Sequence, residues 1–482
     1  MNIEKPKSEK RASVDYSLKW NSINWNIVEM KVSKLQSRIA KAASENRMNL
    51  VKKLQYLLSI SFYAKLLAVK RITSNRGKRT PGVDSEIWSS PGSKYKGALL
   101  LSNKKYRATP LKRTYISKSN GKKRPLGIPT FRDRAMQALH LLCLDPVSES
   151  IMDTSSFGFR KHRSAKDASE HLFNCLSTKF SAKWVLEGDI KGCFDNISHD
   201  WVQENIIMNK KILKQFLKSG YVYKQNLYPT KAGTPQGGII SPTLANLTLN
   251  GMATMLKQKY WTNKVGTIIH RRYNKEKVHI TVYADDFVIT AKSRKTLEDI
   301  KIMLEEFLGK RGLELSKEKT LITHIEKGFN FLGWNFRKYK GKLIIKPSAK
   351  SLKRITAKIR EEVRKNLTQK QELLIIRLNQ IIRGWCNYHK HVCAKKTYQT
   401  LNKNIFRYLW GWAKRRHPMK SKGWRKNKYF TQSKTRDWIF KSEDKILLFA
   451  SDFKIRRHVL IKFEANPYLK EYETYYSERK AC

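Results

Sequence analysis

The hydrophobic pattern of the first 90 residues has helical spacing. Apolar residues recur at intervals of three and four over Val28–Ile39, and the pattern continues over Leu50–Leu57. The segment ends in the turn-rich run TSNRGKRTPGVD, which predicts an ordered loop. We therefore expect residues 1–90 to form a helical N-terminal extension and loop.

Between residues 91 and 340 the pattern changes to short apolar runs separated by helical stretches. The runs KWVLEGDI, HITVYADDFVIT and FNFLGW have the length and the β-branched and aromatic content of buried strands. Strands mixed with helices in this way are typical of an α+β domain built on a central sheet.

After IIKPSAK the pattern is wholly helical. Apolar stripes run through residues 352–363, through QELLIIRLNQIIRGW and through residues 398–412. These stripes predict a separate three-helix module over residues 341–413.

The segment that follows is rich in both charge and rings. Residues 414–438 combine ten Lys and Arg with four large aromatic side chains. Basic groups interleaved with rings suit a surface that binds a single strand or a groove, whereas a solvated charged linker is the alternative. We expect residues 414–482 to form a basic DNA-binding segment with these candidate contacts: Arg415, Arg416, Trp424, Arg425, Lys426 and Lys428.

The charge of the chain indicates its partner. The 482 residues contain 99 Lys and Arg against 39 Asp and Glu, a formal net charge of +60. So large an imbalance is self-repulsive in a compact state unless a polyanion shares the surface. The basic residues run along the whole chain beside its many aromatics, which fits nucleic acid better than an anionic membrane.

Cysteine usage indicates a reducing interior. Six cysteines are scattered without a C-x-x-C pair, which disfavours a disulfide framework or a zinc ribbon. The cluster CNYHKHVC resembles a metal motif, but His391 would point away from the helix face shared by Cys386, His389 and Cys393. We therefore expect a packed helix there.

The termini and the hydropathy bear on location. The N-terminal run MNIEKPKSEKR has no apolar signal core, its two Glu argue against a transit peptide, and no segment approaches a membrane span. We expect a cytoplasmic, nucleoid-associated bacterial protein, while an organellar source stays open.

The run TVYADDFVIT raises the question of chemistry, because it sets Asp285 and Asp286 side by side inside a strand-like segment. Concentrated carboxylate is costly without a counter-charge, which Mg²⁺ supplies; an ordinary β-turn is the alternative. The run WVLEGDI ends in Asp189, and this residue beside the hairpin would complete a set able to hold two Mg²⁺ for phosphoryl transfer. We interpret Asp195 as a structural cap.

Several motifs in fixed order extend this interpretation. RPLGIPTFRDRAMQ, DIKGCF, GTPQGGIISPTLANLTLN and YADD together resemble the sequence blocks of reverse transcriptases, and more finely those of group II intron-encoded proteins, which are reverse transcriptases and maturases. The resemblance covers residues 25–438. It implies a right-hand polymerase with fingers, palm and α-helical thumb, and an RNA-directed DNA polymerase that uses two Mg²⁺. The implied catalytic and metal-binding residues are Asp189, Asp285 and Asp286.

The resemblance also implies nucleotide-binding residues. Phe194 falls on the steric gate that disfavours a ribose 2′-OH, with a core Phe as the alternative. Gln236 and Gly237 lie where the incoming nucleotide or the template passes. Two segments supply cations: Lys123 or Arg124 would hold the triphosphate, and Lys319 would donate a proton to pyrophosphate, with surface charge as the alternative for all three.

RNA contacts follow from the same resemblance. SFGFRKHRS matches the fingers segment that contacts the template through Arg160 and Arg163, although Lys161 and His162 replace the usual Pro-Gly and the local turn can differ. LNQIIRGWCNYH resembles the start of the maturase domain. Its candidate RNA contacts are Arg383, Trp385 and Tyr388, with helix packing as the alternative.

The implied partners are the intron RNA, a DNA target and primer strand, and deoxynucleoside triphosphates. We expect the protein to assist splicing and to copy the intron into DNA during mobility. The chain stops at Cys482 without the H-N-H nuclease of many relatives, so we expect no endonuclease domain. Two alternatives stay open: a splicing factor whose polymerase has decayed, and a reverse transcriptase adopted for a role outside the intron.

Overall fold

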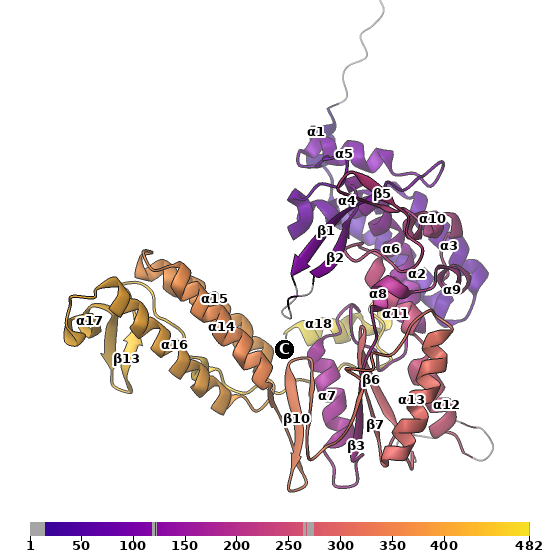
Figure 1. The fold of residues 1–482 in the computed structure, drawn as a ribbon. Coiled ribbons are helices and arrows are strands. Elements are labelled where there is room, and N and C mark those ends of the chain that lie inside the picture. Colours follow the sequence, from indigo (N-terminus) through magenta and orange to yellow (C-terminus); the bar gives the residue numbers. More distant parts are fainter. Residues whose placement is uncertain (1–14, 118–120, 122, 264–266, 268–273, 482) are drawn as a thin grey trace, which may run out of the picture.

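The computed structural model describes residues 15–117, 121, 123–263, 267 and 274–481. Helices and strands form a palm and fingers on one side, and a helical arm, the thumb, extends from them (Figure 1). The run MNIEKPKSEKR and the terminal Cys482 lie outside the described residues. No helix within the described part of the chain is both long and apolar enough to cross a membrane.

The N-terminal extension is helical, as its spacing predicts. Its helices are α1 (Tyr16–Asn21), α2 (Trp25–Ser44), α3 (Met48–Ile60) and α4 (Phe62–Ser74), followed by the short helix η1 (Arg76–Arg79) and by α5 (Pro91–Leu100). The Asn24 side chain caps α2 by accepting from the N–H groups of Asn26 and Ile27. The helices α2, α3 and α4 pack on α6 (Phe131–Ile151), and the extension shares one hydrophobic core with the palm.

The fingers carry a four-stranded sheet of order β2-β1-β4-β5. Its strands are β1 (Leu111–Ser117), β2 (Lys123–Ile128), β4 (Tyr221–Tyr223) and β5 (Asn226–Tyr228). Between β1 and β4 along the chain lie α6 and part of the palm, and the short helices α8 (Cys193–Asn196), α9 (His199–Asn205) and α10 (Lys210–Leu217).

The palm is built on an antiparallel sheet of order β6-β7-β3-β8. Its strands are β3 (Trp184–Asp189), β6 (His279–Tyr283), β7 (Asp286–Ala291) and β8 (Leu321–His324). Side chains alternate between the two faces, so Leu186 and Phe287 join the core with α13 (Arg294–Gly309), while Val185 and Val288 join that with α7 (Ala165–Leu176). Two further helices, α11 (Ser241–Leu249) and α12 (Met252–Tyr260), complete the palm.

A small antiparallel sheet leads from the palm to the thumb. It consists of β9 (Phe329–Phe331), β10 (Trp334–Tyr339) and β11 (Lys342–Pro347). The three predicted thumb helices are present as α14 (Ala349–Lys365), α15 (Gln371–His389) and α16 (Lys395–Arg416). Their apolar stripes, such as Ile355, Ile359 and Val363 of α14, form a core of their own.

The predicted boundary at residue 413 is wrong. The helix α17 (Lys422–Tyr429) and the hairpin of β12 (Phe430–Ser433) and β13 (Arg436–Phe440) complete the thumb, because Tyr429, Phe430 and Phe440 are buried in its core. The thumb therefore continues to the short helix η3 (Ala450–Asp452).

The rest of the chain returns to the palm. We call residues 453–481, which include η4 (Lys470–Tyr472) and α18 (Glu473–Ala481), the C-terminal strap. Ile461, Ala465 and Tyr476 of the strap are buried in the core around α7, where α18 lies in Figure 1. The predicted segment 414–482 is thus divided between two cores and is not one module.

Candidate active site at the end of the palm sheet

The two adjacent aspartates lie at a tight turn between β6 and β7. Tyr283 pairs with Asp286, and Ala284 adopts a left-handed conformation with φ of 58° that makes the turn possible. Gly158 packs directly behind this turn, where a Cβ atom would lie 2.3 Å from the backbone nitrogen of Ala284. The backbone thus holds the turn in place from behind.

The strand β3 brings the third carboxylate beside this turn. Asp189 is the last residue of β3 and pairs in register with Asp286 of β7, so that the two side chains lie on the same face of the sheet. Val185, Leu186 and Gly188 of the same strand are buried, so the first carboxylate beyond this buried stretch emerges at the sheet end beside Asp286.

Burial and neighbouring negative charge raise the pKa values of Asp285 and Asp286. Withdrawal from water, followed by the charges of Asp285 and Asp189, raises the pKa of Asp286 to about 6. The pKa of Asp285 is also raised, first by burial and then by Asp189, while Arg124 and Lys319 oppose the rise. The site therefore favours positive charge.

Lys319 supplies part of that charge. Its Nζ donates to Oδ2 of Asp189 at 2.7 Å, and this hydrogen bond raises the pKa of the lysine. The position follows from backbone pairing, because the segment before Lys319 continues alongside β3: the N–H of Ser316 donates to the carbonyl of Asp189, and that of Lys191 to the carbonyl of Glu314. Lys319 itself is 65% exposed.

The donor set fits a hard divalent cation. Carboxylate oxygens are the ligands that Mg²⁺ prefers, and a cation would offset the burial and the repulsion that together raise the pKa of Asp286. Among the described residues, however, no three His, Cys, Asp or Glu side chains are yet arranged as a complete metal site. Asp189 and Asp286 are paired at the sheet end, and Asp285 lies in the turn directly before Asp286.

A loop next to the aspartates holds two of the predicted nucleotide-binding residues. Gln236 donates through Nε2 to both carboxylate oxygens of Asp195 at 3.1 Å, a link that sequence reasoning missed because it joins residues 41 apart. The carbonyl of Gln236 accepts from the N–H of Gly127 in β2. Gly237 has φ of 112°, and a Cβ there would lie 2.9 Å from the carbonyl oxygen of Gly127.

The remaining nucleotide-binding candidates surround this loop. Phe194 is half-buried in α8, its backbone carbonyl accepts from the N–H of Thr234, and its ring lies 6.5 Å from that of Phe159. Lys123 and Arg124 are exposed on β2, and the charge of Arg124 partly offsets the rise that burial causes in the pKa of Asp285. The structure thus brings the loop, β2 and the carboxylates to one region.

Comparison with known families identifies this arrangement. Residues 116–336 match the family described as reverse transcriptase (RNA-dependent DNA polymerase), residues 20–101 its N-terminal domain, and residues 352–430 the group II intron, maturase-specific domain. The group II intron-encoded protein LtrA of Lactococcus lactis is 32% identical over an alignment that covers 73% of this chain and 72% of LtrA. The chain belongs to the group II intron-encoded proteins.

Two further relatives agree with this family. Protein YkfC of Escherichia coli is 32% identical over 63% of this chain and 88% of its own length. The putative COX1/OXI3 intron 1 protein of Saccharomyces cerevisiae is 28% identical over 68% of this chain and 44% of its own length. The chain is a reverse transcriptase with a maturase role in splicing, and its partners are intron RNA and the nucleic acids of the polymerase reaction. Reverse transcriptases use divalent metal ions.

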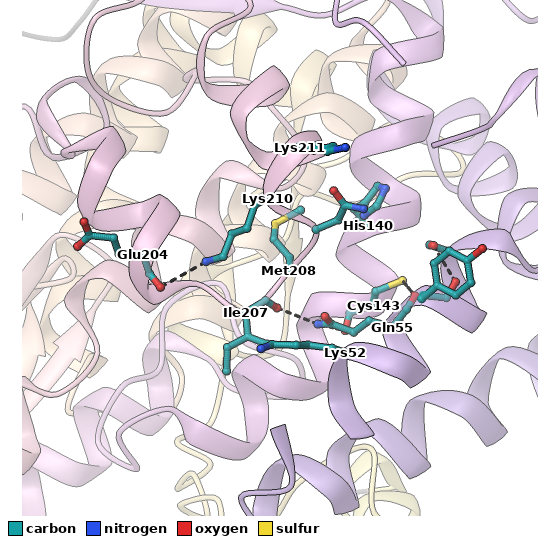
Figure 2. A pocket seen from close by; sticks show the side chains of 12 residues that line it. Lys52, Gln55, His140, Cys143, Glu204, Ile207, Met208, Lys210 and Lys211 are labelled. Carbon is teal, nitrogen blue, oxygen red and sulfur yellow. Dashed lines mark hydrogen bonds between the residues drawn. The ribbon is translucent and has the colours of Figure 1, made fainter. Parts of the chain in front are cut away.

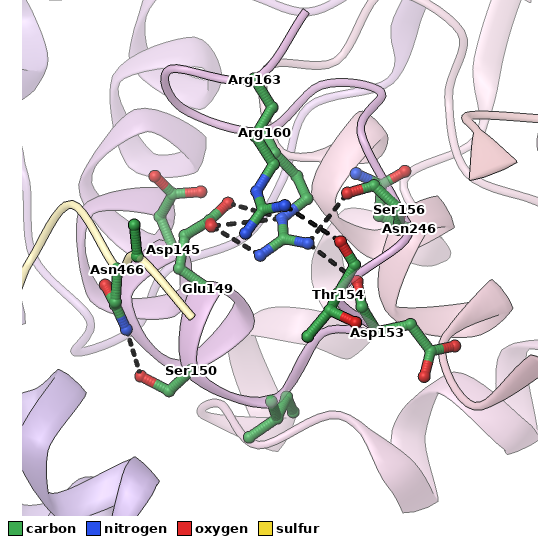
Figure 3. Close-up of polar contacts among 12 residues, drawn as sticks. Asp145, Glu149, Ser150, Asp153, Thr154, Ser156, Arg160, Arg163, Asn246 and Asn466 are labelled. Atoms are coloured by element: carbon green, nitrogen blue, oxygen red, sulfur yellow. Dashed lines mark hydrogen bonds and ion pairs between the residues drawn. The ribbon is translucent and has the colours of Figure 1, made fainter. Parts of the chain in front are cut away.

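The prediction that Arg160 and Arg163 contact the template is wrong for this group II intron-encoded protein, because neither side chain is free to bind a template. The guanidinium of Arg160 is 3% exposed, pairs with Glu149 at 2.8 Å and donates to two backbone carbonyls, those of Asp153 and Ser156 (Figure 3). Arg163 donates to the carbonyls of Thr154 and Phe463, and burial lowers its pKa to about 10.

Two of the maturase candidates pack within the protein. Trp385 donates to the hydroxyl of Ser351 at 3.1 Å, and Tyr388 donates to the carbonyl of Leu332 at 2.8 Å. Arg383 is exposed on α15. Helix packing, the alternative interpretation of the sequence, therefore describes Trp385 and the hydroxyl of Tyr388, while Arg383 and part of the Tyr388 ring are exposed to solvent.

The candidate DNA contacts fall into two groups, side chains bonded within the protein and side chains nearer the surface. Arg425 is 7% exposed and donates to the carbonyl of Ser421, so it is not available for a DNA contact. Arg416 is half-buried and donates through Nη1 to the carbonyls of Leu367 and Gln369, and its DNA contact stays a prediction. The others lie nearer the surface: Arg415 and Lys428 are exposed, Trp424 is half-buried against His417, and Lys426 lies over Trp438 at 5.0 Å.

A cavity of about 690 Å³ lies away from this site. It is bounded by α3, α6 and the loop before α10, and Figure 2 shows Gln55 and Lys210 bridging backbone groups at its edge. None of the predicted site residues lines it. The polymerase chemistry therefore belongs to the sheet end and not to this cavity.

Proposed function

We propose that the protein copies its intron RNA into DNA at a two-Mg²⁺ site held by Asp189, Asp285 and Asp286. When bound, the ions supply positive charge for the attacking 3′ oxygen and for the leaving pyrophosphate. The proposal is supported above all by the register of β3 and β7, which sets Asp189 opposite Asp286 at an open sheet end.

The neighbouring side chains have distinct roles in this proposal. Arg124 and Lys123 bind the triphosphate from β2, and Lys319 gives a proton from Nζ to the leaving pyrophosphate. Gln236, held by Asp195, borders the nucleotide, and Phe194 lies under the sugar, where its bulk excludes a 2′-OH. Phe194→Val should therefore relax discrimination against ribonucleotides, which a competition between deoxynucleotides and ribonucleotides measures.

Primer extension on an RNA template tests the proposal. We expect Asp285→Asn to lower the rate by roughly three orders of magnitude or more, because the variant removes one charge that neutralises the cation. Asp299→Asn, a change at an exposed position of α13, is the matched control and should extend at the wild-type rate. Equal extension by Asp285→Asn and the control would refute the assignment.

The maturase role has a separate test. We propose that the same chain binds its intron RNA to assist splicing and then copies it during mobility. Asp285→Asn should promote splicing as well as the wild type does, because the active-site charge is not needed to hold folded RNA. Loss of splicing together with extension would instead indicate that Asp285 supports the RNA-binding fold.

A further inference from the structure

The loop of residues 233–238, GTPQGG, is bonded to both of the groups that the proposed function assigns to the ends of the nucleotide. At its start, the N–H of Thr234 donates to the carbonyl of Phe194, the proposed sugar gate, at 2.7 Å. Further along, the carbonyl of Gln236 accepts from the N–H of Gly127 at 2.8 Å, in the strand β2 that presents the proposed triphosphate-binding cations. The GTPQGG loop therefore sets how the gate and the phosphate-binding strand lie relative to each other.

One buried imidazole anchors the start of this loop. His199, the first residue of α9, is 5% exposed, and its Nε2 lies 2.8 Å from the carbonyl oxygen of Gly233. A carbonyl oxygen can only accept, so Nε2 carries the proton and donates. Burial lowers the pKa of the ring, and Nδ1 is buried without a hydrogen-bond partner among the described residues, so the ring is neutral. Its hydrogen bond is therefore committed to the loop.

Gly233 itself fits closely against the gate segment. Its φ of 84° lies in the left-handed region that favours glycine, and a Cβ there would lie 2.5 Å from the carbonyl oxygen of Phe194. Its N–H donates to the carbonyl of Ile197 at 2.8 Å, while its carbonyl accepts from His199. Both polar backbone groups of Gly233 are thus bound by the segment that carries the gate.

The anchored loop also lies beside the carboxylates of the proposed metal site. Burial raises the pKa of the Cys193 thiol, and three carboxylates raise it further: Asp285, Asp195 and Asp189. Charge effects weaken with distance, so these carboxylates surround one neighbourhood. Asp195 also accepts from the side chain of Gln236, which places the loop in that neighbourhood.

We propose that His199 is a positioning residue for the incoming deoxynucleotide: by holding the carbonyl of Gly233, it keeps the GTPQGG loop fixed against the sugar gate Phe194. The inference rests on the proposed function, in which Phe194 and Gln236 border the nucleotide. His199 acts through the loop and touches neither the nucleotide nor the metal. It therefore governs how well the nucleotide fits and not how the primer–template binds.

Two substitutions separate the hydrogen bond from the bulk of the ring. His199→Leu removes the donor, whereas His199→Gln keeps an N–H donor at a similar reach. In single-nucleotide addition at saturating primer–template, we expect KM for the deoxynucleotide to rise about tenfold in the Leu variant and to stay within about twofold of wild type in the Gln variant.

The sugar preference gives a second readout, which a general loss of stability would not change. The preference for deoxynucleotides over ribonucleotides should fall about fivefold in His199→Leu, because the backbone of the gate loses its fixed neighbour. KM for the primer–template should stay within about twofold of wild type in both variants.

A matched control is a second buried histidine with the same bonding pattern. His389 of α15 is 1% exposed, its Nε2 is hydrogen-bonded to the hydroxyl of Ser351 at 3.1 Å, and its Nδ1 has no partner within the described part of the chain. His389→Leu should lower the melting temperature about as much as His199→Leu does. It should leave KM for the deoxynucleotide and the sugar preference unchanged; equal changes in this control would overturn the proposal.

Two other results would also count against His199. Unchanged KM and unchanged sugar preference in His199→Leu would overturn the proposal directly, and an equal loss in the Gln and Leu variants would show that the loop needs the bulk of the ring and not its hydrogen bond. Failure of the proposed function is distinguishable, because the wild type would then add no nucleotide and Phe194→Val would leave the sugar preference unchanged.

Discussion

At the scale of single residues, Arg160 and Glu149 form a fully buried ion pair. Arg160→Met leaves the Glu149 carboxylate without a partner in the interior, so we expect a loss of about 3–5 kcal/mol of unfolding free energy. Chemical denaturation measures it. The double variant Arg160→Met, Glu149→Leu should recover much of the loss, since it removes the orphaned charge. If Arg160→Met instead changed KM for the template without changing stability, the result would support the predicted template contact.

Substitution of Asp286 should stabilise the fold, in contrast to substitution of Arg160, because the surroundings of Asp286 disfavour its charged form. Its folded-state pKa of about 6 lies above the ordinary 3.8. Its favourable contribution to the free energy of unfolding is therefore fully present below about pH 4 and is lost as the pH rises through 6. Asp286→Asn should therefore raise the melting temperature of the metal-free protein at pH 7 while abolishing extension.

Calorimetry with and without Mg²⁺ checks this prediction. The higher melting temperature of Asp286→Asn should return to the wild-type value near pH 4. Added Mg²⁺ should stabilise the wild type more than the variant, because only the wild type offers the full ligand set. A lower melting temperature at pH 7 in the absence of metal would show that the carboxylate supports the fold.

Residue spacing and the family resemblance were enough to bring Asp189 to the turn of Asp285 and Asp286. The same reasoning failed for Arg160, because a basic residue in a strongly basic chain resembles a surface contact. Its partner Glu149 lies on α6, most of whose side chains are buried, and only the tertiary structure reveals that burial. The bond from Gln236 to Asp195 was missed for the same reason.

At the scale of elements, the C-terminal strap depends on one carboxylate of α7. Oδ1 of the fully buried Asp167 accepts from His458, from the N–H of Ile461 and from Arg479, all in the strap. Burial alone would raise the pKa of Asp167, but the hydrogen bonds from His458 and Ser164 and the charge of Arg479 hold it below its usual value.

Asp167→Asn should therefore loosen the strap. We expect a loss of about 1.5–3 kcal/mol at pH 7, seen by denaturation, and faster proteolysis within residues 453–481. Because the folded-state pKa is depressed, the contribution of the carboxylate is present above pH 3.8 and is lost as the pH falls through the folded value. The exposed Asp444 is the control; equal proteolysis of Asp167→Asn and Asp444→Asn would contradict the prediction.

The hydrophobic periodicity predicted the three thumb helices, but the end of the thumb was placed too early, at residue 413. Residues 414–438 have the composition of a binding surface, yet Tyr429 and Phe430 point into the thumb core. Composition records which residues are present and not which way they face. The return of the strap to α7 had no local signal, because its partners are about 300 residues away in sequence.

At the scale of the whole molecule, the net charge of +60 predicts that phosphate contacts contribute much of the affinity for RNA. Each phosphate that the protein neutralises in single-stranded RNA should contribute about −0.7 to the slope of log K against log salt. We expect a steep dependence over 50–200 mM salt in filter-binding titrations with the intron RNA. An almost flat dependence would contradict a phosphate-based interface.

The strap also changes what kind of domain the thumb is. The chain leaves the palm after Pro347, at the end of β11. It turns back at Arg456, whose N–H donates to the carbonyl of Lys390 in the thumb, and the strap that follows binds α7 of the palm. In topological terms the thumb is an insertion within the palm and not an appendage. One cut in the loop at Met419, which is 95% exposed, would leave both fragments anchored, so a nicked enzyme should stay assembled.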